Sequence, residues 1–126
     1  MPMNTPRQRR GALAAAAGRQ AEAAAEAALI ADGWQIHARR LRTAAGEIDL
    51  VAERCGLLAI VEVKSRRDLA EAAAALGPRQ RARLRAAAEL LLAEHPAWGA
   101  AGVRFDVLLV DRTGRIRRIA DAFREE

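Results

Sequence analysis

The stretch that most constrains this chain is residues 46–67, GEIDLVAERCGLLAIVEVKSRR, where two apolar runs surround a short polar break. The apolar runs are residues 48–52 and 57–63, and the break at 53–56 ends in glycine. Two β-rich runs separated by a short glycine-bearing break predict an antiparallel hairpin. The unusual feature is that acidic side chains are set inside both apolar runs, at Asp49 and at Glu62.

A register in which residues 54–57 form the loop keeps like side chains on the same face of this hairpin. A slip of one residue would mix apolar and charged side chains, so the pattern itself favours this register. It pairs Leu50 with Val61 on an aliphatic face and Asp49 with Glu62 on a charged face. The remaining predicted pairs are Ile48 with Val63, Ala52 with Ala59, and Glu47 with Lys64.

Two opposed carboxylates repel each other unless a positive charge lies between them, and both Lys64 and a metal ion are candidates. A solvated charged face on an edge hairpin is the simplest alternative. However, Val51, Leu58 and Ile60 fall on the same face, which indicates a covered surface, where carboxylates are rare unless paired or metal-bound. A carboxylate pair beside a lysine is the arrangement that Mg²⁺-dependent phosphodiester hydrolysis requires, since oxygen ligands hold this hard cation.

The sequence at these residues resembles that of a known superfamily. Asp49 followed by Glu62-Val63-Lys64 is similar to the PD-(D/E)XK signature of restriction-endonuclease-like nucleases. Over a longer span the chain resembles the YraN-type family of small predicted bacterial endonucleases, which are similar to archaeal Holliday-junction resolvases. The blocks that carry this resemblance are GRQAE at 18–22, GEIDLV at 46–51, VEVKSR at 61–66, RFDV at 104–107 and Ala122-Phe123.

The resemblance implies a role for each residue that matches the signature. Asp49 and Glu62 would be ligands of Mg²⁺ or Mn²⁺, and Lys64 would orient water or stabilise developing charge. Glu22 matches a glutamate that the family and the resolvases carry on the first helix, where it would help to complete the metal site. A solvated helix glutamate is the alternative for Glu22. The resemblance also implies a homodimer, because resolvase-like relatives act as dimers.

Two further residues are second-tier candidates, and two positions depart from the family pattern. Glu47 faces Lys64 in the predicted register, so it would tune that lysine. Gln80 stands where the family usually has a lysine near the metal site, although resolvase relatives tolerate glutamine there. Arg40 stands where the family usually has an asparagine. These departures bear on Gln80 and Arg40 themselves more than on the nuclease interpretation.

The charge of the chain is consistent with a nucleic-acid partner, most simply DNA. Its 21 basic and 16 acidic residues give a net charge of +5, and Lys64 is the only basic residue that is not arginine. A basic chain of this kind suits a polyanion, although a GC-rich genome would also enrich arginine and alanine together. The arginines near the carboxylates are the predicted phosphate contacts. They are Arg39, Arg40, Arg42, Arg66, Arg67, Arg79 and Arg83.

The order of expected elements predicts an α/β fold with a mixed central sheet flanked by helices, in the order αβββαββ. We expect a disordered basic tail over residues 1–11 and a single nuclease-like domain over 12–126. A strand over 34–42 would place Trp34, Ile36 and Ala38 on one side. The other expected elements are helices at 12–32 and 78–94, a helix or alanine-rich segment at 69–76, and strands at 103–111 and 115–119.

Several function classes are excluded or disfavoured by composition. Cys55 is the only cysteine, so no disulfide forms within the chain. No apolar run approaches the length of a membrane span, and the N-terminal run is too weakly hydrophobic for a signal peptide, so we expect a cytoplasmic protein. The leading hypothesis is a metal-dependent, structure-selective endonuclease with a role in DNA repair or recombination. The alternatives are a nucleic-acid-binding protein with little or no cleavage activity and a scaffold with a solvated charged hairpin.

Overall fold

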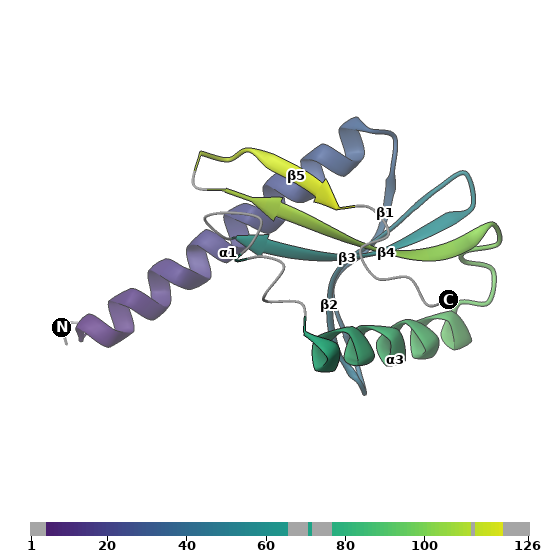
Figure 1. Cartoon of the computed structure of the whole chain (residues 1–126), viewed down its shortest axis with the longest axis horizontal. Coiled ribbons are helices and arrows are strands. Elements are labelled where there is room, and N and C mark those ends of the chain that lie inside the picture. The colour runs from purple at the N-terminus through teal and green to yellow at the C-terminus, as the bar shows by residue number, and fades with distance from the viewer. Residues whose placement is uncertain (1–4, 66–70, 72–76, 112, 120–126) are drawn as a thin grey trace.

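The computed structural model describes residues 5–65, 71, 77–111 and 113–119. This part of the chain forms a five-stranded sheet in the order β1-β2-β3-β4-β5, with β3 and β4 parallel and the other neighbours antiparallel (Figure 1). The predicted mixed α/β fold is confirmed, and it is consistent with a restriction-endonuclease-like fold. The elements are α1 (Pro6–Ala31), β1 (Gln35–Thr43), β2 (Gly46–Arg54), β3 (Leu57–Ser65), α3 (Pro78–Glu94), β4 (Gly102–Val110) and β5 (Ile116–Ile119).

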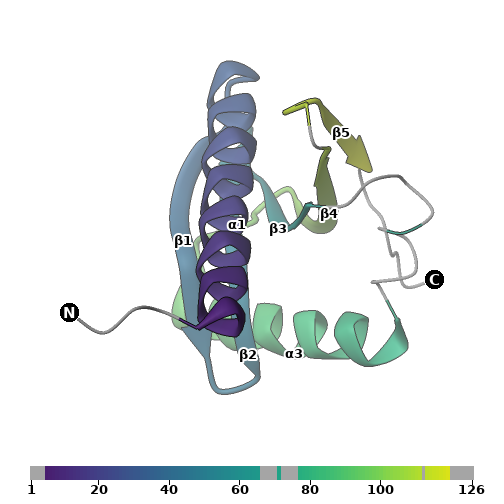
Figure 2. The same cartoon turned by 90° about the vertical axis from the view of Figure 1, so that its left-hand side faces the viewer.

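The two described helices lie on opposite faces of the sheet, and each covers its own apolar cluster (Figure 2). Beneath α1, Ala25 and Leu29 pack with Leu50 and Val61. Beneath α3, the buried positions of the helix pack against the opposite faces of the same strands. We call this group the α3 cluster. Its buried members are Ile48, Val51, Leu58, Ile60, Ala87, Ala88 and Leu91. The sheet is therefore covered on both sides, which explains the near-continuous apolar runs of β2 and β3.

Helix α1 begins at Pro6, earlier than the expected start at residue 12, and so includes part of the expected tail. The cause is a capping box at Thr5. The Thr5 hydroxyl accepts the Gln8 amide at 3.1 Å, and the Gln8 side chain accepts the Thr5 amide at 2.8 Å. Proline at the first helical position adds a preset φ angle. At the other end, Gly33 follows the helix with a φ of 85°, the left-handed conformation in which glycine commonly ends a helix.

The hairpin of β2 and β3 closes through a two-residue turn, Cys55-Gly56, with φ angles of 51° and 78°. Two successive positive φ values define the tight turn that matches the twist of paired strands. The predicted pairs of Leu50 with Val61 and of Ala52 with Ala59 are confirmed. The β2–β3 pairing ends at Leu50, however, so the predicted cross-strand pairs of Ile48 and Glu47 do not form.

Beyond this point β2 stays paired with β1, where Leu41 lies opposite Ile48, whereas β3 continues beside β4 as far as Ser65. Ile48 consequently packs in the α3 cluster rather than on the aliphatic face with Leu50. A second irregularity occurs in β1, where the register shifts between Ile36 and Ala38. A bulge of this kind inserts one residue and reverses the faces that follow it. Ala38 therefore packs toward α3, which corrects the prediction that it shares a side with Trp34 and Ile36.

The carboxylate of Asp106 is a structural group. Its side chain is fully buried and accepts hydrogen bonds from Arg118 Nε at 3.0 Å and from Arg104 Nε at 3.2 Å. The guanidinium groups of Arg104 and Arg118 also lie over the ring of Trp34, at 5.2 and 4.8 Å from its centroid. This pairing joins β4 to β5 and the start of β1, as a buried carboxylate requires.

Three predictions concern residues outside the described part of the chain, namely the segment 69–76 apart from residue 71, the phosphate contacts Arg66 and Arg67, and the terminal pair Ala122-Phe123. Within the described part, neither helix has both the length and the apolar character needed to cross a membrane.

Candidate functional site

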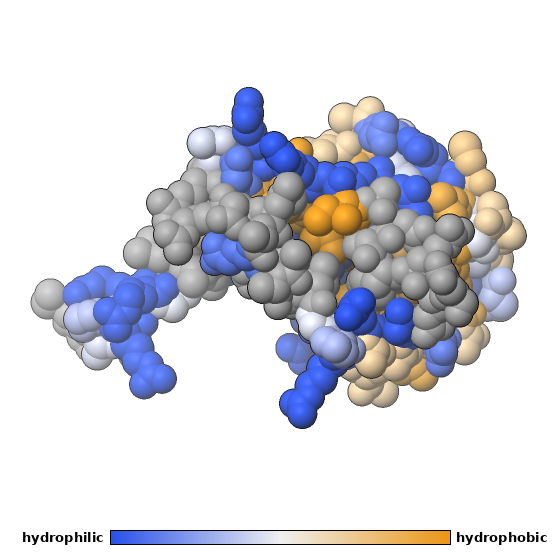
Figure 3. Space-filling view, in the orientation of Figure 1, coloured by the Kyte–Doolittle hydropathy of each residue, from blue (hydrophilic) through white to orange (hydrophobic). Residues whose placement is uncertain are grey.

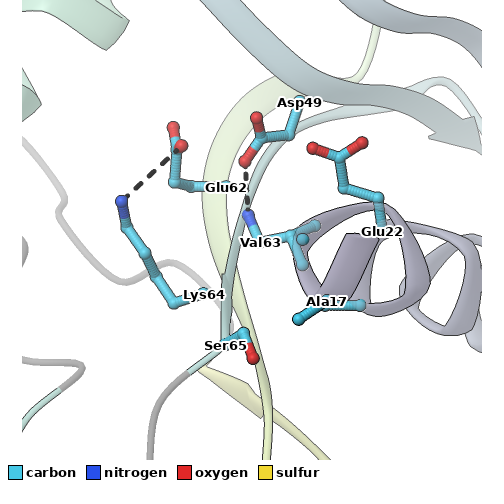
Figure 4. Close-up of a pocket in the computed structure, with 9 residues that line it drawn as sticks. Ala17, Glu22, Asp49, Glu62, Val63, Lys64 and Ser65 are labelled. Carbon is cyan, nitrogen blue, oxygen red and sulfur yellow. Dashed lines mark hydrogen bonds and ion pairs between the residues drawn. The ribbon is translucent and has the colours of Figure 1, made fainter. Parts of the chain in front are cut away.

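A pocket of about 470 Å³ opens between α1 and the ends of β2 and β3. It brings together four residues that the sequence analysis selected from three separate elements (Figure 4). Glu22 comes from α1, Asp49 from β2, and Glu62 and Lys64 from β3. The rest of the lining consists of Ala17, Gly18, Ala21, Val63 and Ser65.

The pocket exists because β2 and β3 separate at Asp49. The backbone amide of Val63 donates a 2.8 Å hydrogen bond to Oδ2 of Asp49 instead of to the backbone of β2. The Asp49 side chain thus takes the place of a backbone acceptor between the two strands. This hydrogen bond fixes its carboxylate beside β3. A carboxylate that accepts a backbone amide is held in one orientation, as a ligand or catalytic group needs to be.

Glu62 is the least ordinary group in the pocket. Its residue is only 6% exposed, and its Oε2 atom is buried with no hydrogen-bond partner among the described residues. Lys64 Nζ lies 3.9 Å from Oε1, and Arg83 Nη2 lies 3.6 Å from Oε2. Burial and, after it, the neighbouring Asp49 carboxylate raise the pKa of Glu62 to about 8, against the opposing effect of Lys64 and Arg83.

These groups fit a divalent cation. A buried carboxylate oxygen without a donor, beside a second carboxylate, is a costly arrangement that a hard cation would relieve. Asp49 and Glu62 are the residues that would hold it. No cluster of three or more His, Cys, Asp or Glu side chains suited to a metal occurs among the described residues, so water or substrate oxygens would fill the remaining positions.

Glu22 lines the pocket, but its carboxylate is already engaged. Arg40 Nε donates a 2.7 Å hydrogen bond to Glu22 Oε2. The Arg40 backbone has a φ of 46°, an uncommon value for a residue other than glycine. The structure therefore places Arg40 as the partner of a pocket carboxylate, although it was predicted as a phosphate contact.

The remaining predicted arginines differ in how available they are. Arg39 forms an ion pair with Glu26 of α1. The side chain of Arg42 is 90% exposed and lies 3.8 Å from the Glu47 carboxylate, so Glu47 pairs with Arg42 and not with Lys64 as predicted. Arg79 is exposed near the start of α3.

Arg83 was expected to contact phosphate, but the structure places it against the carboxylate site. Its Nη1 donates to the Glu47 carbonyl at 2.7 Å, and its Nε donates to Oε1 of Gln80 at 3.3 Å. The chain makes room for it at Gly46, where an added Cβ would lie 2.5 Å from Arg83 Nη1. Four alternating arginines in one helix give no signal that singles out Arg83. Its spacing of one helical turn from Gln80 is the only clue in the sequence.

Comparison with known proteins shows the family to which this chain belongs. Residues 21–110 match the uncharacterised protein family UPF0102. A UPF0102 protein of Granulibacter bethesdensis is 64% identical over 115 residues, covering 91% of this chain and 73% of the relative. A UPF0102 protein of Azorhizobium caulinodans is 51% identical over 125 residues, covering 99% of this chain and 95% of the relative. The chain belongs to the UPF0102 family.

Proposed function

We propose that this protein is a metal-dependent endonuclease that cleaves nucleic acid, with Asp49 and Glu62 as the ligands of Mg²⁺ or Mn²⁺. The observation that supports this most is the buried Oε2 of Glu62, which accepts no hydrogen bond from the described residues, at a pocket that Glu62, Asp49 and Lys64 line together. A purely structural carboxylate would be expected to have its hydrogen bonds satisfied, as Asp106 does in the same sheet.

Each residue of the pocket would have a separate role in the hydrolysis of a phosphodiester bond. A bound divalent cation would supply an activated water and neutralise charge on the phosphate. The amide of Val63 holds Asp49 in place, and the Lys64 ammonium can donate to water or to a phosphate oxygen at the pocket. Lys64 is also only 16% exposed in its side chain, so its charge acts in a partly desolvated site, where it is stronger than at the surface.

Activity is tested with purified protein and a panel of branched, flapped, duplex and single-stranded DNAs and RNA, with Mg²⁺ or Mn²⁺. Cleavage of at least one substrate, lost in Asp49→Asn and Glu62→Gln, is the expected result. Size-exclusion chromatography with light scattering, on the same preparation, tests the proposed homodimer.

Metal binding is tested separately, by calorimetry with Mn²⁺ in the presence and absence of a non-cleavable oligonucleotide. We expect weak binding that strengthens with the oligonucleotide, because substrate phosphate completes such sites. Absence of Mn²⁺ binding at millimolar concentrations in both cases would remove the metal site and favour the solvated scaffold. Metal and nucleic-acid binding without cleavage of any substrate would favour the alternative, a nucleic-acid-binding protein with a nuclease-like fold.

A further inference from the structure

Among the described side chains of α1, the buried ones all lie in its C-terminal half, which packs on the sheet. Ala21, Ala25 and Leu29 are buried there, whereas residues 5–12 are exposed. The N-terminal half projects past the edge of the sheet as a straight arm, and hydrophilic residues gather at its end (Figures 1 and 3). The arm leaves the body at Ala17 and Gly18, which line the carboxylate pocket, so a ligand that enters the pocket lies next to it.

The helical repeat places two arginines on the pocket side of this arm. Arg7 precedes the buried Ala25 by eighteen residues, which is five full turns, and Arg10 lies within the same stripe. The face that packs on the sheet thus continues along the pocket wall and ends in Arg7 and Arg10. Arg9 and Arg19 lie on other faces of α1. We call the stripe of Arg7, Arg10, Gly11 and Gly18 the inner face of the arm.

Gly18 has no role within the folded chain that requires glycine. It lies in the middle of α1, its φ is not positive, and a Cβ added there would meet no atom of the described residues within 4 Å. A glycine inside a helix makes that helix less stable than an alanine would. The open space that it leaves lies at the wall of the pocket, where a bulky ligand backbone would pass.

The positive charge of the arm favours a polyanionic ligand. Between Pro6 and Gln20 the only charged residues are four arginines, and the first turn of α1 has no acidic residue. The N-terminal end of a helix also carries a partial positive charge. From Gly18 to Arg7 the arm spans about 16 Å at 1.5 Å per residue. On one strand of a duplex, with about 3.4 Å per nucleotide, this length corresponds to about five phosphates.

We propose that the inner face of the arm binds the phosphate backbone of a nucleic-acid duplex and directs one strand past Gly18 into the pocket. The proposal deepens the proposed function and rests on it for what happens in the pocket. It specifies the substrate as one with a duplex segment of about five base pairs beside the cleaved phosphate. A rigid helix holds its arginines at a fixed distance from the pocket, and a duplex holds its phosphates at fixed distances in the same way.

The first test measures binding of a labelled blunt duplex by fluorescence anisotropy in EDTA, so that neither metal nor cleavage contributes. The double variant Arg7→Gln/Arg10→Gln is compared with Arg9→Gln/Arg19→Gln, which removes the same charge from other faces of the same helix. We expect the inner pair to weaken binding about tenfold and to reduce the slope of log K against log salt by about 1.8. The outer pair should leave the slope close to that of the wild type.

The second test introduces bulk at Gly18. Gly18→Leu should weaken duplex binding at least tenfold, while Gly18→Ala should bind within about twofold of the wild type. Both variants should melt at or above the wild-type temperature, because the space is open and the helix gains propensity. Unchanged Mn²⁺ binding by Gly18→Leu would show that the carboxylates themselves are intact. A Gly18→Leu protein that binds duplex as well as the wild type would overturn the proposal.

The outcomes separate this proposal from the nuclease function. Equal losses in the inner and outer double variants would show diffuse attraction and overturn the inner-face assignment, with the endonuclease proposal untouched. Binding through the inner face without cleavage of any substrate would support the duplex surface and count against the endonuclease. Conversion of a wild-type dimer to a monomer by the inner pair would assign the face to a second copy of the chain, and would also overturn the proposal.

Discussion

The guanidinium of Arg83 lies 3.6 Å from Oε2 of Glu62, just beyond hydrogen-bonding distance, and is held there by Gln80 and the carbonyl of Glu47. Glu62 therefore has a cation near each oxygen, Arg83 on one side and Lys64 on the other, yet its pKa is raised to about 8. Burial and the neighbouring Asp49 outweigh both cations. A divalent cation bound beside Glu62 would favour its ionised form and so lower this pKa.

The raised pKa of Glu62 predicts that stability falls with pH in the absence of metal. The folded pKa is about 8 and the ordinary value is 4.5, so the folded state binds the extra proton between these values. The stabilisation is complete below about pH 4.5 and is lost as pH rises through 8. We expect urea denaturation to show a fall of a few kcal/mol in the free energy of unfolding across this window, relative to Glu62→Gln. Identical pH profiles for the two proteins would contradict the prediction.

Release of Glu22 from Arg40 is predicted to strengthen metal binding. In Arg40→Gln, the Glu22 carboxylate loses its 2.7 Å hydrogen bond and becomes a third acidic group free to act in the pocket. We expect Mn²⁺ affinity, measured by calorimetry, to rise several-fold, because an added carboxylate ligand favours a hard cation. Arg39→Gln is the matched control, since Arg39 pairs with Glu26, which does not line the pocket. Equal affinities in the two variants would leave Glu22 as a structural partner of Arg40.

Much of this site follows from the sequence, and its limits have physical causes. Alternation of apolar and charged residues specified the hairpin register from Leu50 inward, because a slip would bury charge. It did not reveal that β2 separates from β3 at Asp49, since from there β2 follows β1 and β3 follows β4, and strand partners distant in sequence leave no local pattern. The sequence also did not indicate the role of Arg83. That role depends on the space beside Gly46, a residue far from Arg83 in the sequence. Long-range contacts of this kind leave no local periodicity.

The buried carboxylate of Asp106 is predicted to stabilise the fold and to take no part in chemistry. Asp106→Asn removes the charge that pairs with Arg104 and Arg118, and leaves both guanidinium groups half-buried. We expect a loss of about 3–5 kcal/mol in the free energy of unfolding, measured with urea. Asp32→Asn is the control, because Asp32 contacts the same Arg118 at 3.4 Å but is 57% exposed, and it should cost under about 1 kcal/mol. Similar losses in both would show that burial of the pair is not the source of its effect.

Lys64 provides the sharpest separation of chemistry from binding. It is the only lysine among 21 basic residues, so composition alone does not account for it. An ammonium is a compact charge with three donors, whereas a guanidinium needs a flat set of acceptors. If the protein cleaves, Lys64→Ala and Lys64→Arg should both lower the rate by about 10²–10³ while duplex affinity stays nearly unchanged.

The charge-conserving swap Arg117→Lys, at an exposed site on β5, is the control for Lys64→Arg and should leave the rate unchanged. The competing interpretation is that Lys64 only balances Glu62, 3.9 Å away. In that case Lys64→Arg would retain the charge, change stability by under about 1 kcal/mol and cut as fast as the wild type. Single-turnover cleavage rates, measured beside anisotropy on the same duplex, decide between them. A fully active Lys64→Arg protein would leave Asp49 and Glu62 to support catalysis without a lysine.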